Sequence, residues 1–217
     1  MQSQFDGEGF FWIIGLRRSG TSILRRLLAA SPNIGPVLFE PHPLFHAIGM
    51  NHLDRFKAQG YVQKILQDYT AQKRPGKWIG AKLAINPGAG GLEWIWLPLT
   101  FKGSKIVFVT RGIRETWRSY EAADRDIVRG FVPWTAYQPA AEFTVARFRQ
   151  HIKEHPADAI EVKYENILAD VDEALRPVFE FLKAAVPTSL ARMIERPKFL
   201  PGEAQTAGRK ESDGQKK

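Results

Sequence analysis

The fold of this chain is decided by one stretch, Ile13-Ile14-Gly15-Leu16-Arg17-Arg18-Ser19-Gly20-Thr21-Ser22-Ile23-Leu24-Arg25-Arg26-Leu27-Leu28. It begins inside a short apolar run, residues 10–14, that is rich in β-favouring side chains. Gly15 and Gly20 bracket a turn. Apolar residues then recur at helical spacing: Ile23, Leu24, Leu27 and Leu28. The stretch therefore predicts a buried strand, a tight turn and an amphipathic helix.

The turn ends where the expected helix begins, and this position favours anions. The first backbone N–H groups of a helix lack intrahelical partners, and the positive end of the helix dipole points outward there. A phosphate or sulfate group binds at such a terminus with little help from side chains. The turn adds further donors: Arg17, Arg18, Ser19, Thr21 and Ser22. We interpret it as an anion-binding loop, the alternative being an ordinary strand–turn–helix with surface arginines.

The composition is typical of a globular protein. The chain has 217 residues, of which 44% are hydrophobic and 25% charged, enough for one good core. We expect a single domain over residues 1–200 and a disordered tail over residues 201–217, because the tail is polar and lacks hydrophobic periodicity. The net charge of +8 implies an attraction for anions, which a nucleotide, a nucleic acid, an anionic lipid or an acidic glycan would satisfy.

Some classes of chemistry and location are disfavoured. The chain contains no cysteine, which excludes disulfides, thiolate catalysis and cysteine-ligated metals. We expect no metal site, because four histidines lack metal-ligand spacing: His46, His52, His151 and His155. Residues 1–9 are polar, and the apolar run after them is about six residues, too short for a signal peptide or a membrane span. We therefore expect a soluble, cytoplasmic protein.

Short apolar runs and helical patterns alternate along the chain. The further expected strands are residues 37–39, 78–83, 105–111 and 159–163. The helical patterns cover residues 44–71, 92–99, 113–120, 140–154 and 171–182. Residues 122–134 are charged and irregular, and we expect a loop or lid there. This alternation predicts a three-layer α/β fold whose central parallel sheet has about five strands, with residues 105–111 at its centre.

A second basic motif follows the strand at residues 105–111. Arg111 ends that strand, and Ser119 follows after one or two helical turns. Both side chains can face one anion, and the planar guanidinium group holds a phosphate through two parallel charge-assisted hydrogen bonds. Read alone, Arg111 is a surface salt-bridge residue and Ser119 an ordinary helix hydroxyl. Their spacing after a buried strand favours a binding pair.

Taken together, the two motifs resemble those of sulfotransferases that use 3′-phosphoadenosine-5′-phosphosulfate (PAPS). The turn is similar to the family's R-S-G-T-[ST] loop, which carries the 5′-phosphosulfate of the donor. Arg111 and Ser119 match the family's 3′-phosphate motif, and residues 162–170 are similar to a strand and Tyr-Glu-x-Leu segment found in many members. The resemblance covers residues 10–182 and is nearer to the carbohydrate-directed and bacterial members.

This resemblance implies a P-loop-NTPase-like fold, PAPS as donor and 3′,5′-adenosine bisphosphate (PAP) as product, without a metal. It implies that Arg18 contacts the phosphate that is released. The implied donor-binding residues are Arg17, Arg18, Ser19, Gly20, Thr21, Ser22, Arg111 and Ser119. The family's Arg-Lys-Gly segment has no convincing match at residues 207–210, so the adenine site is unassigned.

Three residues are candidates for the chemistry. Glu40 follows the expected strand at residues 37–39, at the edge of a parallel sheet where ligands collect. Its carboxylate is ionised at neutral pH, so it is our candidate general base; the alternative is that it holds one of the loop arginines. His42 is the alternative base or a partner that orients Glu40. Lys82 resembles the lysine of a Lys-Thr-Pro segment in some members, although residues 83–84 break the match.

The resulting hypothesis is in-line transfer of a sulfuryl group to a hydroxyl or amine of a small-molecule or glycan acceptor. The alternative is a non-catalytic basic module that binds nucleic acid or an anionic glycan, with Trp94, Trp96, Trp117 and Trp134 available for stacking. Core packing is the commoner use of tryptophan. A nucleotide kinase is disfavoured, because Thr21 stands where the loop G-x-x-x-x-G-K-[ST] has its lysine.

Overall fold

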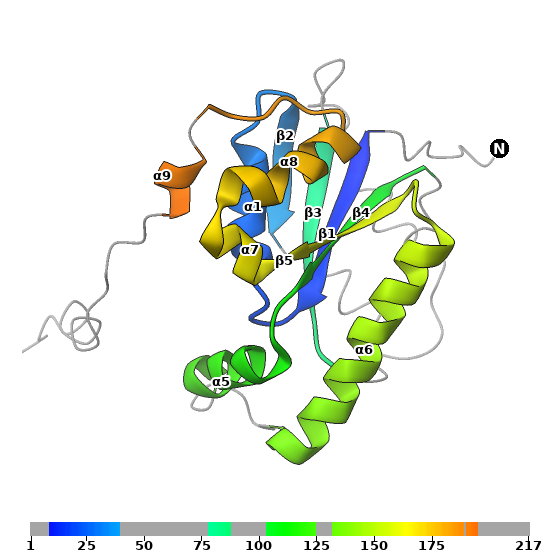
Figure 1. The fold of residues 1–217 in the computed structure, drawn as a ribbon, viewed down its shortest axis with the longest axis vertical. Helices are drawn as coiled ribbons and strands as arrows, with labels where there is room; N and C mark the ends of the chain where they lie inside the picture. Colours follow the sequence, from blue (N-terminus) through cyan, green and yellow to red (C-terminus); the bar gives the residue numbers. More distant parts are fainter. Residues whose placement is uncertain (1–8, 40–77, 88–102, 125–131, 189, 195–217) are drawn as a thin grey trace, which may run out of the picture.

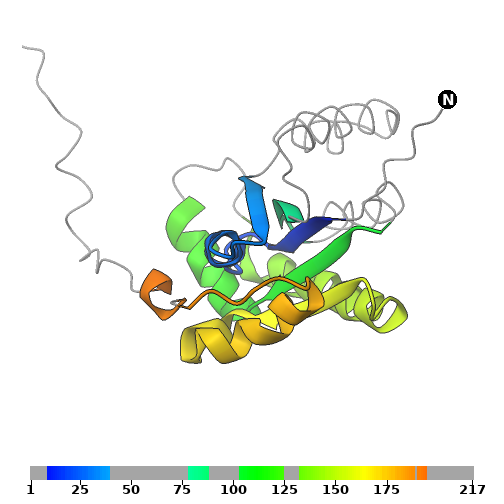
Figure 2. The same cartoon turned by 90° about the horizontal axis from the view of Figure 1, so that it is seen from above.

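A five-stranded parallel sheet forms the centre of the molecule in the computed structural model, which describes residues 9–39, 78–87, 103–124, 132–188 and 190–194 (Figure 1). The strand order is β2-β3-β1-β4-β5, and every neighbouring pair is parallel. The strands are β1 (Phe10–Leu16), β2 (Ile34–Phe39), β3 (Trp78–Ile85), β4 (Lys105–Thr110) and β5 (Ala159–Lys163). The sheet twists from β2 to β5 (Figure 2).

Helices cover both faces of this sheet. They are α1 (Thr21–Ala29), α5 (Ile113–Asp124), α6 (Trp134–Glu154), α7 (Tyr164–Ala169), α8 (Val171–Phe181) and α9 (Ala191–Ile194). The helices α1, α7 and α8 lie on one face, α6 lies on the other, and α5 lies near the end of β4 (Figure 1). The predicted three-layer α/β class with a P-loop-like arrangement is confirmed.

The burial of β1 explains why its sequence contains no polar side chain. Phe10, Trp12 and Ile14 pack into the core beneath α6, whereas Phe11 and Ile13 pack into the core beneath α1 and α8. All seven residues of β1 are buried. Because both faces of a parallel sheet are covered by helices, its inner strands read as continuous apolar runs rather than alternating ones.

The order of the strands corrects one expectation. The central strand is β1, and β4 lies between β1 and β5. Both strands are buried on two faces, and this burial produces the same continuous apolar pattern. The pattern therefore marks an inner strand without fixing its rank in the sheet.

The expected loop at residues 122–134 overlaps helices at both of its ends. The helix α5 continues to Asp124, and α6 begins at Trp134 rather than at residue 140. Pro139 therefore lies within α6, at an exposed position. Of the expected segments, residues 44–71, 92–99, 125–131 and 201–217 lie outside the described residues. Within the described parts, no helix is long and apolar enough to cross a membrane.

Candidate functional site

The loop of residues 17–20 and the second basic motif, Arg111 and Ser119, meet at the carboxyl edge of the sheet, where ligands collect in parallel α/β folds. A cavity of about 340 Å³ opens there. Its lining comes from the segments that follow β1, β4 and β5 and from the second half of β3. The lining residues are Arg17, Arg18, Gly20, Thr21, Ser22, Ile23, Lys82, Ala84, Arg111, Ser119 and Tyr164.

Two residues of the loop have left-handed backbone conformations. Arg18 has φ 69° and Gly20 has φ 105°. For a residue with a side chain this conformation costs about 1 kcal/mol, and such strain clusters at functional sites. At Gly20 a side chain is excluded for a second reason, because a Cβ atom would lie 2.3 Å from Cδ2 of Tyr164. The loop therefore requires glycine at position 20.

The start of α1 leaves backbone donors open. The carbonyl oxygen of Gly20 accepts the first helical hydrogen bonds, from the N–H groups of Ile23 and Leu24, both at 3.0 Å. The N–H groups of Gly20, Thr21 and Ser22 precede this ladder and have no acceptor among the described residues. These groups and the positive end of the helix dipole are suited to an anion.

Direct hydrogen bonds join the two predicted motifs. The Nε atom of Arg18 donates to Oγ of Ser119 at 3.3 Å, and Nη1 of Arg111 donates to the carbonyl oxygen of Arg18 at 3.1 Å. The guanidinium carbon of Arg111 lies 4.8 Å from the centre of the Tyr164 ring, a cation–π distance. The sequence separated these motifs by about ninety residues, and the fold places them against one cavity.

Lys82 supplies a further positive charge from β3. Its side chain is 2% exposed, and Nζ donates to Oγ of Ser22 at 3.2 Å. Together with Arg17, Arg18 and Arg111 it gives the cavity four cationic side chains, whereas none of the described lining residues is a carboxylate. A ligand with two or more negative charges would be attracted to this group of cations.

Ser19 is placed differently from its neighbours in the loop. It is 1% exposed and does not line the cavity. Its hydroxyl lies beneath the loop, where a Cβ atom added at Gly15 would come within 2.5 Å of it, and this hydroxyl has no hydrogen-bond partner in the described part of the chain. Its N–H group donates to the carbonyl oxygen of Leu16 at 3.0 Å. Ser19 therefore shapes the turn.

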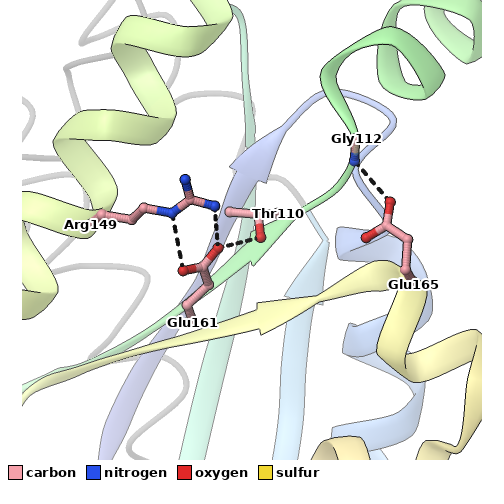
Figure 3. Close-up of polar contacts among 5 residues, drawn as sticks. All are labelled: Thr110, Gly112, Arg149, Glu161 and Glu165. Carbon is pink, nitrogen blue, oxygen red and sulfur yellow. Dashed lines mark hydrogen bonds and ion pairs between the residues drawn. The ribbon is translucent and has the colours of Figure 1, made fainter.

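A partly buried polar cluster supports the end of β4 beside the cavity (Figure 3). Glu161 of β5 accepts hydrogen bonds from the Thr110 hydroxyl at 2.6 Å and from Nη2 of Arg149 at 3.2 Å. Burial alone would raise the pKa of Glu161. The hydrogen bonds from Thr110 and Arg149, with the charges of Arg149 and Lys163, outweigh burial and hold this pKa below its ordinary value.

Two predicted residues, Glu40 and His42, lie outside the described residues. The strand that precedes them is not next to β1, because β3 lies between β2 and β1. Phe39, the last residue of β2, is in register with Lys82. Glu40 is the next residue in the sequence, so its role stays a prediction.

Three lining residues were not predicted as site residues: Ile23, Ala84 and Tyr164. Tyr164 had a sequence signal, since it directly follows β5 and so reaches the same sheet edge as Arg111. Its ring is 6% exposed. Its contacts with Gly20 and Arg111 come from segments that meet only in the folded chain.

The tryptophans proposed for base stacking serve packing where they are described. The rings of Trp117 and Trp134 meet edge to face with 5.6 Å between centroids, and Nε1 of Trp117 donates to the carbonyl oxygen of Val132. Trp94 and Trp96 lie outside the described residues. Across the described ranges, no three His, Asp or Glu side chains cluster in a way that could hold a metal ion.

Solved structures of sulfotransferases share this fold. The sulfotransferase domain of the Synechococcus PCC 7002 olefin synthase has a TM-score of 0.62 and 15% identity, covering 89% of this chain and 80% of its own. Mouse sulfotransferase SULT7A1, solved in complex with PAP, has a TM-score of 0.57 and 19% identity, covering 87% of this chain and 64% of its own. The sulfotransferase from Alicyclobacillus acidocaldarius has a TM-score of 0.55 and 14% identity, covering 81% of each chain.

No protein-family model and no curated protein sequence matches the chain. The likeness is therefore carried by the arrangement of the backbone. The chain has the fold of these sulfotransferase domains.

Proposed function

We propose that this protein is a PAPS-dependent sulfotransferase that transfers a sulfuryl group to a hydroxyl or amine of a small-molecule or glycan acceptor. One observation carries the proposal: the loop that begins at Arg17 and the pair Arg111 and Ser119 line one cavity, within the fold of sulfotransferase domains. The hydrogen bond between Arg18 and Ser119 places the two motifs in contact. The solved mouse sulfotransferase in complex with PAP adds support.

The residues present fit a donor with two phosphate-bearing ends. The open N–H groups at the start of α1, with Thr21 and Ser22, would hold the 5′-phosphosulfate. Arg111 and Ser119 would hold the 3′-phosphate, which distinguishes PAPS from ATP. When bound, PAPS supplies the sulfuryl group. Arg17 and Arg18 line the same cavity and add positive charge.

Positioning and electrostatics carry most of the proposed catalysis. Arg18 and Lys82 would stabilise the negative charge that develops on the leaving phosphate, because fixed cations away from bulk water act more strongly than they do in water. Glu40 would take the proton of the acceptor, and His42 would orient Glu40 or replace it as base. The register of β2 with β3 supports this assignment, since Glu40 follows the residue beside Lys82. The likeness to carbohydrate-directed and bacterial members and a cytoplasmic location also stay predictions.

Calorimetry with two nucleotides tests the proposal directly. PAP and AMP differ by the 3′-phosphate, so a protein with a 3′-phosphate site should bind PAP about a hundredfold more tightly. The titrations should be run at one ionic strength, because salt screens the phosphate contacts. Equal affinities, or no binding of either nucleotide, would overturn the proposal.

A further inference from the structure

Three consecutive residues at and after the end of β4 are each held by a residue from β5 or from the first turn of α7. The Thr110 hydroxyl donates to Glu161, the Arg111 guanidinium lies over the ring of Tyr164, and the Gly112 N–H donates to Oε1 of Glu165 at 2.8 Å. Two of these three attachments are drawn in Figure 3. Arg111, the residue proposed to bind the 3′-phosphate, is therefore held through its own side chain and through both of its neighbours in the sequence.

Of the three contacts, the hydrogen bond to Glu165 affects the largest part of the site. Gly112 directly precedes α5, and its carbonyl oxygen accepts a hydrogen bond from the N–H group of Thr116 at 2.9 Å, which begins the helix. Glu165 also places a negative charge at the positive end of the α5 dipole. Ser119 lies on α5, so one carboxylate anchors the turn that sets both Arg111 and Ser119.

Glu165 acts outside the cavity. It is exposed and is not among the lining residues, whereas the neighbouring Tyr164 is. Its removal leaves no hole in the core, which separates its effect on the site from an effect on folding.

We propose that Glu165 is a positioning residue for the 3′-phosphate site: its carboxylate holds the Gly112 N–H, and thereby sets Arg111 and Ser119 against the loop of Arg18. This inference rests on the proposed function. It extends that function by making the preference for a 3′-phosphate depend on a residue that does not touch the nucleotide.

Three variants test this role: Glu165→Ala, Glu165→Gln and, as a matched control, Glu180→Ala, an exposed glutamate of α8. Affinities for PAP and AMP and the thermal midpoint should be measured for each. Glu165→Ala should reduce the preference for PAP over AMP about fivefold by loosening the Arg111 turn, with AMP affinity unchanged. Glu165→Gln should keep most of the preference, because its amide oxygen still accepts the hydrogen bond. Glu180→Ala should match wild type.

A second measurement needs no nucleotide. Hydrogen exchange of the Gly112 amide should be faster in Glu165→Ala than in wild type and restored in Glu165→Gln. An unchanged nucleotide preference in Glu165→Ala, or an equal loss of affinity for PAP and AMP together with a lower thermal midpoint, would overturn the positioning role. An amide exchange rate at Gly112 that does not respond to Glu165→Ala would overturn the anchor itself. A wild-type protein without preference for PAP would instead overturn the proposed function.

Discussion

The loop of residues 17–20 and the turn that begins at Arg111 face the same cavity, but they are built differently. The loop offers backbone N–H groups at the start of α1, shaped by two left-handed residues, Arg18 and Gly20. The Arg111 turn offers side chains, and its backbone is held by neighbouring side chains such as Glu165. The loop should therefore be sensitive to changes in backbone conformation, whereas the Arg111 turn should be sensitive to the loss of single side chains.

This difference in construction also gives the two regions different effects on ligand selectivity. Backbone donors at a helix N-terminus hold any phosphate or sulfate of the right size, because they carry no side-chain information. A guanidinium group placed at a fixed distance from that terminus selects a ligand with a second anionic group at the same distance. In the proposed enzyme the loop binds the 5′-phosphosulfate, and the Arg111 turn distinguishes nucleotides with a 3′-phosphate from those without one.

The largest expected effect is a loss of turnover that leaves nucleotide binding by both regions intact. Glu40→Gln should reduce turnover about a thousandfold, because the amide cannot take the acceptor's proton. Its affinity for PAP should stay within about twofold of wild type, since neither the loop nor Arg111 is altered. Turnover with a broad acceptor panel and calorimetry with PAP check both expectations. A Glu40→Gln enzyme with full turnover would move the role of base to another group, with His42 as the next candidate.

The second largest effect is expected from a substitution that disturbs the backbone of the loop. Gly20→Ala should lower the free energy of unfolding by about 3 kcal/mol, because it places a Cβ atom at φ 105° and against the Tyr164 ring. Binding of PAP and AMP should fall together. Urea unfolding and calorimetry measure the two effects. Gly35→Ala, at a glycine of β2 outside the left-handed region, is the control and should cost less; equal costs would remove the special role of Gly20.

A change in the other region should be milder and selective. Arg111→Ala should weaken PAP binding by about 2 kcal/mol, roughly thirtyfold, and leave AMP binding unchanged. Arg114→Ala removes an equal charge from the exposed face of α5 and serves as the control. If both variants lose PAP affinity equally, net charge rather than the fixed position of Arg111 provides the selectivity.

The smallest effect concerns the support of the Arg111 turn and its dependence on pH. Glu161 has a lowered pKa in the folded protein, so its ion pair with Arg149 stabilises the fold above its ordinary pKa of 4.5. That contribution is lost as pH falls from 4.5 through the lowered value. Wild type should exceed Glu161→Gln by about 0.5 kcal/mol at pH 7, and this difference should shrink towards pH 3.

The midpoints of urea unfolding between pH 7 and 3 give the comparison. Burial, followed by the charge of His155, lowers the pKa of His151, so acid also destabilises the fold below about pH 6.5 through that group. This loss is common to wild type and Glu161→Gln and cancels in their difference. A difference that stays constant down to pH 3 would contradict the role of the Glu161 carboxylate.

Much of the fold could be predicted from the sequence because its signals are local. The apolar run of β1, the turn and the spacing of α1 lie within one continuous stretch, and the alternation of strands and helices restricts the layers. The rank of β4 could not be predicted, since burial on two faces produces the same pattern in any inner strand. The start of α6 was missed, because this helix begins six residues before the predicted start at residue 140 and contains Pro139, a residue that disfavours a helix interior.

The residues of the candidate site also divide into those that the sequence could predict and those that it could not. Arg18 and Arg111 could be chosen from local motifs, and the fold brings them together. Tyr164 and Glu165 could not be given their contacts, because those contacts depend on how closely β5 approaches the turn after β4. Glu40 and His42 stay predictions.

The position of β1 in the middle of the sheet also has a consequence for biosynthesis. This strand leaves the ribosome first, yet its two partners begin only at Trp78 and Lys105. Contacts this distant in sequence form late, because each requires the closure of a long loop. The six apolar residues and one glycine of β1 therefore stay unpaired in the nascent chain, where such strands are prone to aggregate. Pulse-labelled hydrogen exchange during refolding should find late protection in β1, which would make chaperone capacity a limit on the yield of this protein.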